Sequence, residues 1–155
     1  MRLVSNSSPL IALAKIGMLG ILREDLVIPQ AVFAELTESA KEYADEFDTW
    51  CKERVIEVKD PRAVEYLELM LGKGEAEAIA LAEELKTNIV LIDDLKARKI
   101  AKLRGLNVIG TLGILLDAKD RGIIVEIRPL LEELMKKRIR ISKELYDRTL
   151  ELAHE

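Results

Sequence analysis

The feature that most constrains the fold is a regular alternation of short apolar segments with longer segments of helical periodicity. Strands are predicted at residues 3–5, 26–28, 55–58, 88–92 and 107–109. The fourth is the strongest, because its continuous apolar run is typical of a strand covered on both faces. Strands joined by helices pair in parallel and place helices on both sides of the sheet. The pattern therefore predicts a three-layer α/β/α fold around a five-stranded parallel sheet.

The intervening segments carry helical signals. Pro9 is suited to a first helical turn, and Gly17, Gly105 and Gly122 are suited to helix ends. A helix is expected over residues 31–43, with one apolar face formed by Val32, Leu36 and Ala40. No linker or repeat interrupts the 155 residues, a length typical of one domain. We expect a single domain over residues 1–155, with the helices of residues 129–155 packed as part of it.

The composition limits the available chemistry. Cys51 is the single cysteine and His154 the single histidine, which excludes a disulfide framework, a multi-thiolate zinc site and a histidine-based triad. Uncharged runs are no longer than twelve residues, as in 105–116, whereas a membrane span needs about 20. No signal peptide is recognised at the start, so a cytoplasmic protein with no membrane association is expected.

Charge is unevenly distributed. The net charge is −4, so the basic footprint of many nucleic-acid-binding domains is missing. A local basic cluster nevertheless occupies residues 136–140, with Lys143 close by. It either contacts nucleic-acid phosphates or forms a solvated turn between two helices.

Polar residues gather where the predicted strands end. Asn6 follows the first strand, and Asp93 and Asp94 follow the fourth; Glu35, Glu75 and Glu77 lie near the starts of helices that could face the same edge. Ligands of open parallel sheets bind at the carboxyl ends of strands. Converging oxygen ligands suit Mg²⁺ or Mn²⁺, which can orient a phosphate and activate water. The alternative is that these residues are only helix caps, turn residues or solvated surface groups.

Five segments together resemble the PIN-domain family, in the same order and over essentially the whole chain. They are residues 4–11, an opening with small hydroxyl residues and an apolar helix; 28–36, with a glutamate after a strand and a proline; 72–82, an acid opening an alanine-rich helix; 91–98, an acid at the end of the central strand; and 108–113. The last segment is similar to a PIN-like subfamily of prokaryotic proteins.

The resemblance implies a Mg²⁺- or Mn²⁺-dependent single-strand ribonuclease, and many such proteins are the toxins of VapBC-type toxin–antitoxin pairs. It implies catalytic roles for Glu35, Glu75 and Asp94, and a metal site formed by Asn6, Glu35, Glu75, Asp93 and Asp94. Glu77 competes with Glu75, and Asp93 with Asp94, for one position each. Ser8 matches the hydroxyl that supports the first acid, and Ser8, Lys96 and Arg98 are expected to bind substrate. The expected partners are RNA and a small antitoxin protein, and a homodimer is also considered.

One departure from the family pattern opens a second interpretation. Asn6 stands where the family has its first aspartate, and an amide oxygen binds a hard cation more weakly and cannot act as a general base. The alternative is a catalytically weakened PIN-like module that acts by binding RNA or a protein. A phosphoacceptor receiver is disfavoured because its acid pair would follow the first strand, and a dinucleotide-binding domain because no Gly-x-Gly-x-x-Gly is present.

Overall fold

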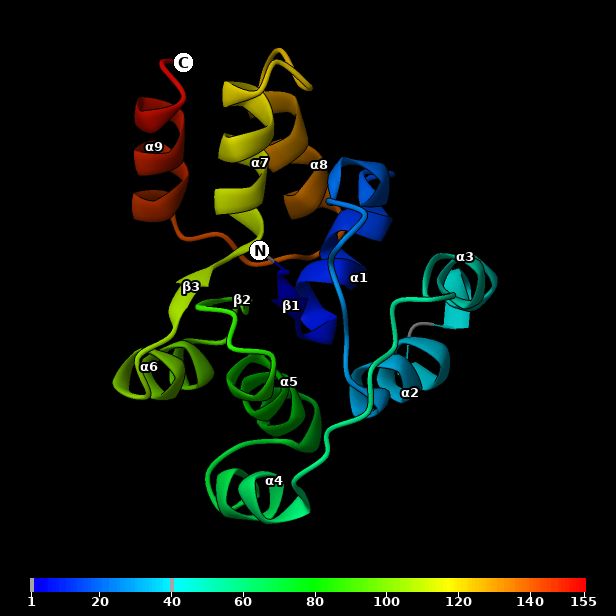
Figure 1. Cartoon of the computed structure of the whole chain (residues 1–155). Helices are drawn as coiled ribbons and strands as arrows, with labels where there is room; N and C mark the ends of the chain where they lie inside the picture. Colours follow the sequence, from blue (N-terminus) through cyan, green and yellow to red (C-terminus); the bar gives the residue numbers. More distant parts are fainter. Residues whose placement is uncertain (1, 40) are drawn as a thin grey trace.

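A parallel sheet lies at the centre of the molecule. The computed structural model describes residues 2–39 and 41–155. Its strands are β1 (Val4–Ser5), β2 (Ile89–Leu91) and β3 (Asn107–Ile109), in the spatial order β1-β2-β3 (Figure 1). Val90 of β2 pairs with Val4 on one side and Val108 on the other. The strongest predicted strand is therefore the central one, as a strand buried on both faces should be.

The sheet has three strands in the described residues, so the prediction of five is wrong in number. Residues 26–28 and 55–58 make only the single bridges Val4↔Val27 and Ile28↔Val55. The physical reason lies in the chain that follows: Pro29 has no N–H to extend a ladder, and a helix begins at Gln30. Residues 26–28 are therefore too short to pair further, which also limits the pairing of residues 55–58 with them.

These two bridged segments still define the topology. Across the sheet the order is residue 55, residue 28, β1, β2 and β3. The direction of winding reverses between β1 and β2, which makes their carboxyl ends a topological switch point. The two ends are joined directly, because the Asn6 N–H donates to the Leu91 carbonyl at 3.0 Å.

Helices occupy most of the remaining chain (Figure 1). They are α1 (Ser7–Lys15), α2 (Gln30–Ser39), α3 (Ala44–Trp50), α4 (Pro61–Glu68), α5 (Lys73–Glu84), α6 (Leu95–Leu103), α7 (Thr111–Asp120), α8 (Arg128–Lys136) and α9 (Lys143–Leu152), with short 3₁₀ turns η1 (Leu19–Ile21) and η2 (Lys41–Tyr43). The helix predicted over residues 31–43 instead ends as α2 at Ser39, before η2 and α3. Ala40, expected on its apolar face, lies outside the described residues.

The core is divided between the two faces of the sheet, because successive strand side chains point to opposite sides. Leu91 packs with α1, α2, α7, α8 and α9, whereas Val90 and Ile92 pack with α4, α5 and α6. Leu131 of α8 and Leu150 of α9 belong to the same buried cluster as Leu10 of α1. No helix of the described chain is long and apolar enough to cross a membrane.

Candidate active site

The end of β1 brings together the first part of the site. Asn6 is buried and precedes α1, but its side chain makes no capping hydrogen bond to that helix. The next residue, Ser7, donates its hydroxyl proton to Glu35 Oε2 at 2.5 Å, across 28 residues of sequence. The hydroxyl group thereby holds the α2 carboxylate close to the carboxyl end of β1.

The start of α5 brings the second acid against the first. A Cβ at the buried Gly74 would lie 2.8 Å from Glu35 Cδ, so the carboxyl of Glu35 rests on the Gly74 backbone. Glu75 is the next residue, in the first turn of α5. The glycine therefore makes room for Glu35 next to Glu75.

The third acid is Asp94, which caps α6. Its Oδ2 accepts a hydrogen bond from the Ala97 N–H at 2.9 Å. Burial raises the pKa of Glu75, and the negative charges of Asp94 and Glu35 raise it further, against a hydrogen bond from the Gly72 backbone that lowers it. Carboxylates from α2, α5 and the end of β2 therefore share one electrostatic environment.

Asp93 has a different set of contacts from its neighbour Asp94. Its Oδ1 accepts from the Thr111 N–H at 2.7 Å and its Oδ2 from the Thr111 hydroxyl at 2.5 Å. Arg98 donates to the Ile92 carbonyl at 2.9 Å beside it. Asp93 thus holds the start of α7 at the end of β2.

Glu77 also binds a helix N-terminus. Its Oε1 accepts from the Ala31 N–H at 3.0 Å, in the first turn of α2. The sequence left two pairs open, Glu75 with Glu77 and Asp93 with Asp94. In each pair, one acid belongs to the carboxylate cluster and the other binds the N-terminus of a neighbouring helix. The cluster members are Glu75 and Asp94.

The remaining predicted residues differ in their placement. Ser8 is exposed, and its neighbour Ser7 is the serine that donates to Glu35. Lys96 is exposed and Arg98 is half-buried. Three residues that position the acids are not among the predicted site residues: Ser7, Gly74 and Thr111. The sequence signals that could have found them are a serine next to Ser8, a glycine at a helix start and a threonine that opens a helix.

The donor set fits a hard divalent cation in its chemistry. Among residues 2–39 and 41–155, no three Asp, Glu, His or Cys side chains are already close enough to enclose a metal. The cluster nevertheless consists of oxygen donors whose mutual repulsion raises the pKa of Glu75, and a cation between them would offset that repulsion. Mg²⁺ keeps several waters and needs only one or two carboxylates, so a closed cage is not required.

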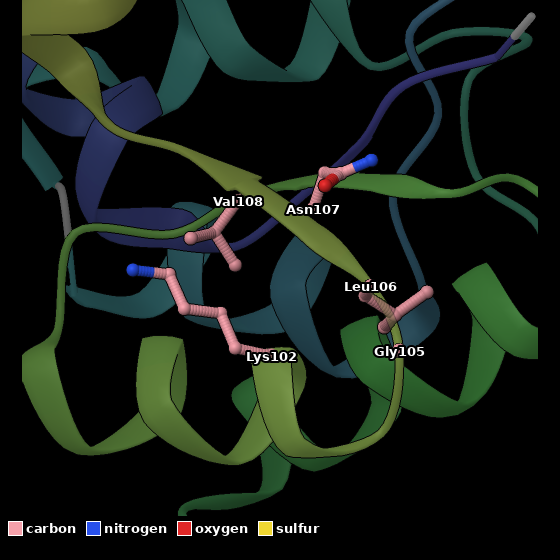
Figure 2. Close-up of a pocket in the computed structure, with 5 residues that line it drawn as sticks. All are labelled: Lys102, Gly105, Leu106, Asn107 and Val108. Carbon is pink, nitrogen blue, oxygen red and sulfur yellow. The ribbon is translucent and has the colours of Figure 1, made fainter.

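Surface hollows lie at both ends of the sheet. A hollow of about 450 Å³ is lined by Lys102 and residues 105–108, at the amino end of β3 (Figure 2). It lies at the end of the sheet away from the carboxylates. A second hollow, of about 310 Å³, lies beside Glu35 and is also lined by Gln30, Lys73 and Glu77. This second hollow gives solvent access to Glu35.

Fold and site together define a class of protein: a parallel α/β domain with carboxylates gathered at the switch point of its sheet. A family model described as PIN domain matches residues 2–155, and the chain belongs to that family. No curated protein and no solved structure matches the chain. PIN domains are nucleases that generally depend on divalent metals and typically act on RNA.

Proposed function

We propose that this protein is a Mg²⁺- or Mn²⁺-dependent endoribonuclease that cleaves single-stranded RNA. The observation that carries the proposal is that Glu35, held by Ser7 and resting on Gly74, lies next to Glu75, whose pKa is raised by burial and then by the charges of Asp94 and Glu35. Three carboxylates from separate elements are costly to hold together unless a cation binds there. In this proposal they hold the metal with the amide oxygen of Asn6, and Asp93 supports the site through α7.

The chain's own residues have distinct tasks in this proposal. The bound metal would supply orientation of the phosphate and activation of a water. Ser7 keeps Glu35 in place, and the N-terminus of α6 keeps Asp94 in place. With His154 the sole imidazole in the sequence, proton transfer falls to carboxyl groups.

The proposal extends to partners. A toxin role, with a small antitoxin protein as inhibitor, follows from the family resemblance, as do a cytoplasmic location and a homodimer. Lys96 and Arg98 would contact the RNA backbone near Asp94. A neighbouring reading frame for a small antitoxin-like protein would support the toxin role.

The test is cleavage of varied single-stranded RNAs by the wild type, Asp94→Asn and Glu75→Gln, with Mn²⁺ and with chelator. Each variant keeps the shape of the side chain and removes its charge. We expect cleavage that depends on Mn²⁺ and falls by roughly 10²-fold or more in each variant, as when one charge-stabilising group is lost. Glu46→Gln, an exposed residue of α3, is the matched control. Cleavage that persists in chelator would contradict the metal-dependent mechanism.

A second candidate is a binding module without catalysis. It is favoured by Asn6, which replaces a charged ligand by a neutral one at a buried position. RNA binding by a wild type that cleaves no RNA would favour this candidate.

A further inference from the structure

A further hollow is lined by Asp93, the residue directly before Asp94 in the sequence. It has a volume of about 170 Å³ and is lined by Asp93 and Thr111 together with apolar side chains and Arg140. The apolar lining residues are Leu112 of α7, Leu134 of α8, Ile139 and Ile141 of the α8–α9 linker, and Leu145 of α9. At about 30 Å³ per water, the volume is enough for a single flat heterocycle.

Besides Arg140, the polar residues that line this hollow are Asp93 and Thr111, which bind each other. Both oxygens of Asp93 are bound to Thr111, at 2.7 and 2.5 Å. A carboxylate oxygen accepts more than one hydrogen bond, so Asp93 keeps acceptor capacity for an N–H of a ligand. A hollow with mostly apolar walls and one fixed acceptor matches the ordinary design of a small-ligand site.

Its position links it to the carboxylate cluster. Asp93 lines the hollow, and Asp94, the next residue, belongs to the cluster that raises the pKa of Glu75. The linker between α8 and α9 passes the point where β3 leads into α7, close to the carboxyl edge of the sheet (Figure 1). A ligand that contacts Asp93 in the hollow would therefore contact the residue directly before Asp94 in the sequence.

The chain segment that leads to the hollow is basic. Arg140 lines the hollow, and Lys136, Lys137 and Arg138 precede it in the chain. Within the described chain none of these four side chains is among the ion pairs. Leu145, which also lines the hollow, is 48% exposed. Free positive charge beside exposed apolar surface suits a ligand that combines a phosphate with a planar ring.

We propose that this hollow is a nucleobase subsite, which accepts one base of the RNA strand while the basic linker contacts its phosphates. The inference rests on the proposed function and adds a place for base discrimination beside the site of cleavage. Bases with an exocyclic amine can donate to Asp93, whereas uracil, which has no amine, can offer only its ring N–H. Adenine, cytosine or guanine should therefore be preferred over uracil.

The test measures binding in chelator, so that cleavage is not needed. Labelled single-stranded pentaribonucleotides of each base are titrated against the wild type, Ile141→Trp, Arg140→Ala and Val125→Trp. Ile141→Trp fills the hollow, and we expect about tenfold weaker binding of the preferred base and loss of the preference over uracil. Arg140→Ala should weaken all sequences alike and reduce the salt dependence. Val125→Trp, at a position 84% exposed in the α7–α8 loop, adds the same side chain away from the hollow and should bind like the wild type.

A second measurement uses the unmodified protein. Nucleoside 5′-monophosphates are titrated while the Thr111 amide and the Ile139 and Ile141 methyl signals are followed by NMR. Saturable shifts at these positions are expected for the preferred base. If Ile141→Trp binds all RNAs like the wild type, or nucleotides shift signals only elsewhere, the subsite is wrong even when the wild type cleaves RNA. If nucleotides bind at Thr111 but no RNA is cleaved, the subsite stands and the nuclease proposal fails.

Discussion

Glu35 is held by two neighbours that act in opposite ways. Ser7 attracts its carboxylate through a hydrogen bond, and Gly74 admits it by having no side chain. Neither neighbour adds a carboxylate to the site. Both nevertheless decide where the Glu35 oxygens lie relative to Glu75 and Asp94, and residues of this kind can change activity without changing the fold.

Substitution of Gly74 should separate stability from activity. In Gly74→Ala the new methyl group would overlap the Glu35 carboxyl, which can swing away because it is the end of a flexible side chain. Alanine favours the helix by up to about 1 kcal/mol over glycine. We therefore expect an unchanged or higher melting temperature with cleavage reduced at least roughly tenfold. Gly20→Ala, where the added Cβ meets nothing within 4 Å, should retain activity; equal activity in both variants would show that the position of Glu35 is unimportant.

The amide of Asn6 sets the metal affinity in the proposed site. Asn6→Asp adds a fourth carboxylate, so it should lower the melting temperature without metal and bind Mn²⁺ more tightly. A tenfold gain in affinity adds about 1.4 kcal/mol at saturation, or about 3–6 °C in melting temperature for a chain of this size. The measurement is a thermal melt over a Mn²⁺ titration, with Asn107→Asp at the amino end of β3 as the control. A response to Mn²⁺ equal to that of the wild type would remove Asn6 from the ligand set.

At the scale of elements, carboxylates hold helix N-termini throughout the molecule. Asp93 binds the start of α7, Glu77 the start of α2, and Asp94 the start of α6. Each satisfies a backbone N–H that the helix itself leaves free. Carboxylates therefore both anchor helix N-termini and take part in the proposed chemistry. The contacts of each Asp or Glu side chain distinguish the two roles.

Glu155 anchors α8 in this way, and the stability that this anchor contributes should depend on pH. Burial alone would raise its pKa, but the Ile127 N–H, the Lys119 ammonium and the Arg128 N–H lower it from 4.5 to about 2. A lowered carboxyl pKa stabilises the fold above the unfolded value and ceases to do so as pH falls from about 4.5 to about 2. Glu155→Gln should lower the free energy of unfolding by about 1 kcal/mol at pH 7, as for loss of a cap. In urea titrations the difference from the wild type should shrink at pH 3; a constant difference would argue against the ionic anchor.

At the scale of the whole molecule, the two buried clusters meet at the sheet and share its strands. Leu91 belongs to one cluster while Val90 and Ile92 belong to the other. The last two helices contribute Leu131, Leu134 and Leu150 to the cluster that contains α1. Because the clusters share the strands of one sheet, we predict that the chain unfolds as one unit.

Calorimetry should show one cooperative transition. At about 0.7 kcal/mol per residue, the unfolding enthalpy near 60 °C should be about 110 kcal/mol, with equal calorimetric and van't Hoff values. Leu131→Ala, at a fully buried position of α8, should lower the stability by about 2–5 kcal/mol and shift the whole transition. A separate early transition of α8 and α9 in this variant would show that they form an independent unit.

The sequence by itself determined the α/β class, the family, the central position of residues 89–91 and the helix ends near Gly17, Gly105 and Gly122. These depend on local periodicity and on short motifs, which a linear pattern contains. Tertiary structure decided that residues 26–28 and 55–58 make only single bridges, and that α2 and α3 are separate. It also decided that Ser7 binds Glu35, and that Asp93 and Glu77 bind the N-termini of neighbouring helices while Asp94 caps its own helix and raises the pKa of Glu75. These outcomes depend on hydrogen-bond partners up to 46 residues apart. Such partners meet only when the layers of the fold pack together, and the periodicity of the sequence contains no information about them.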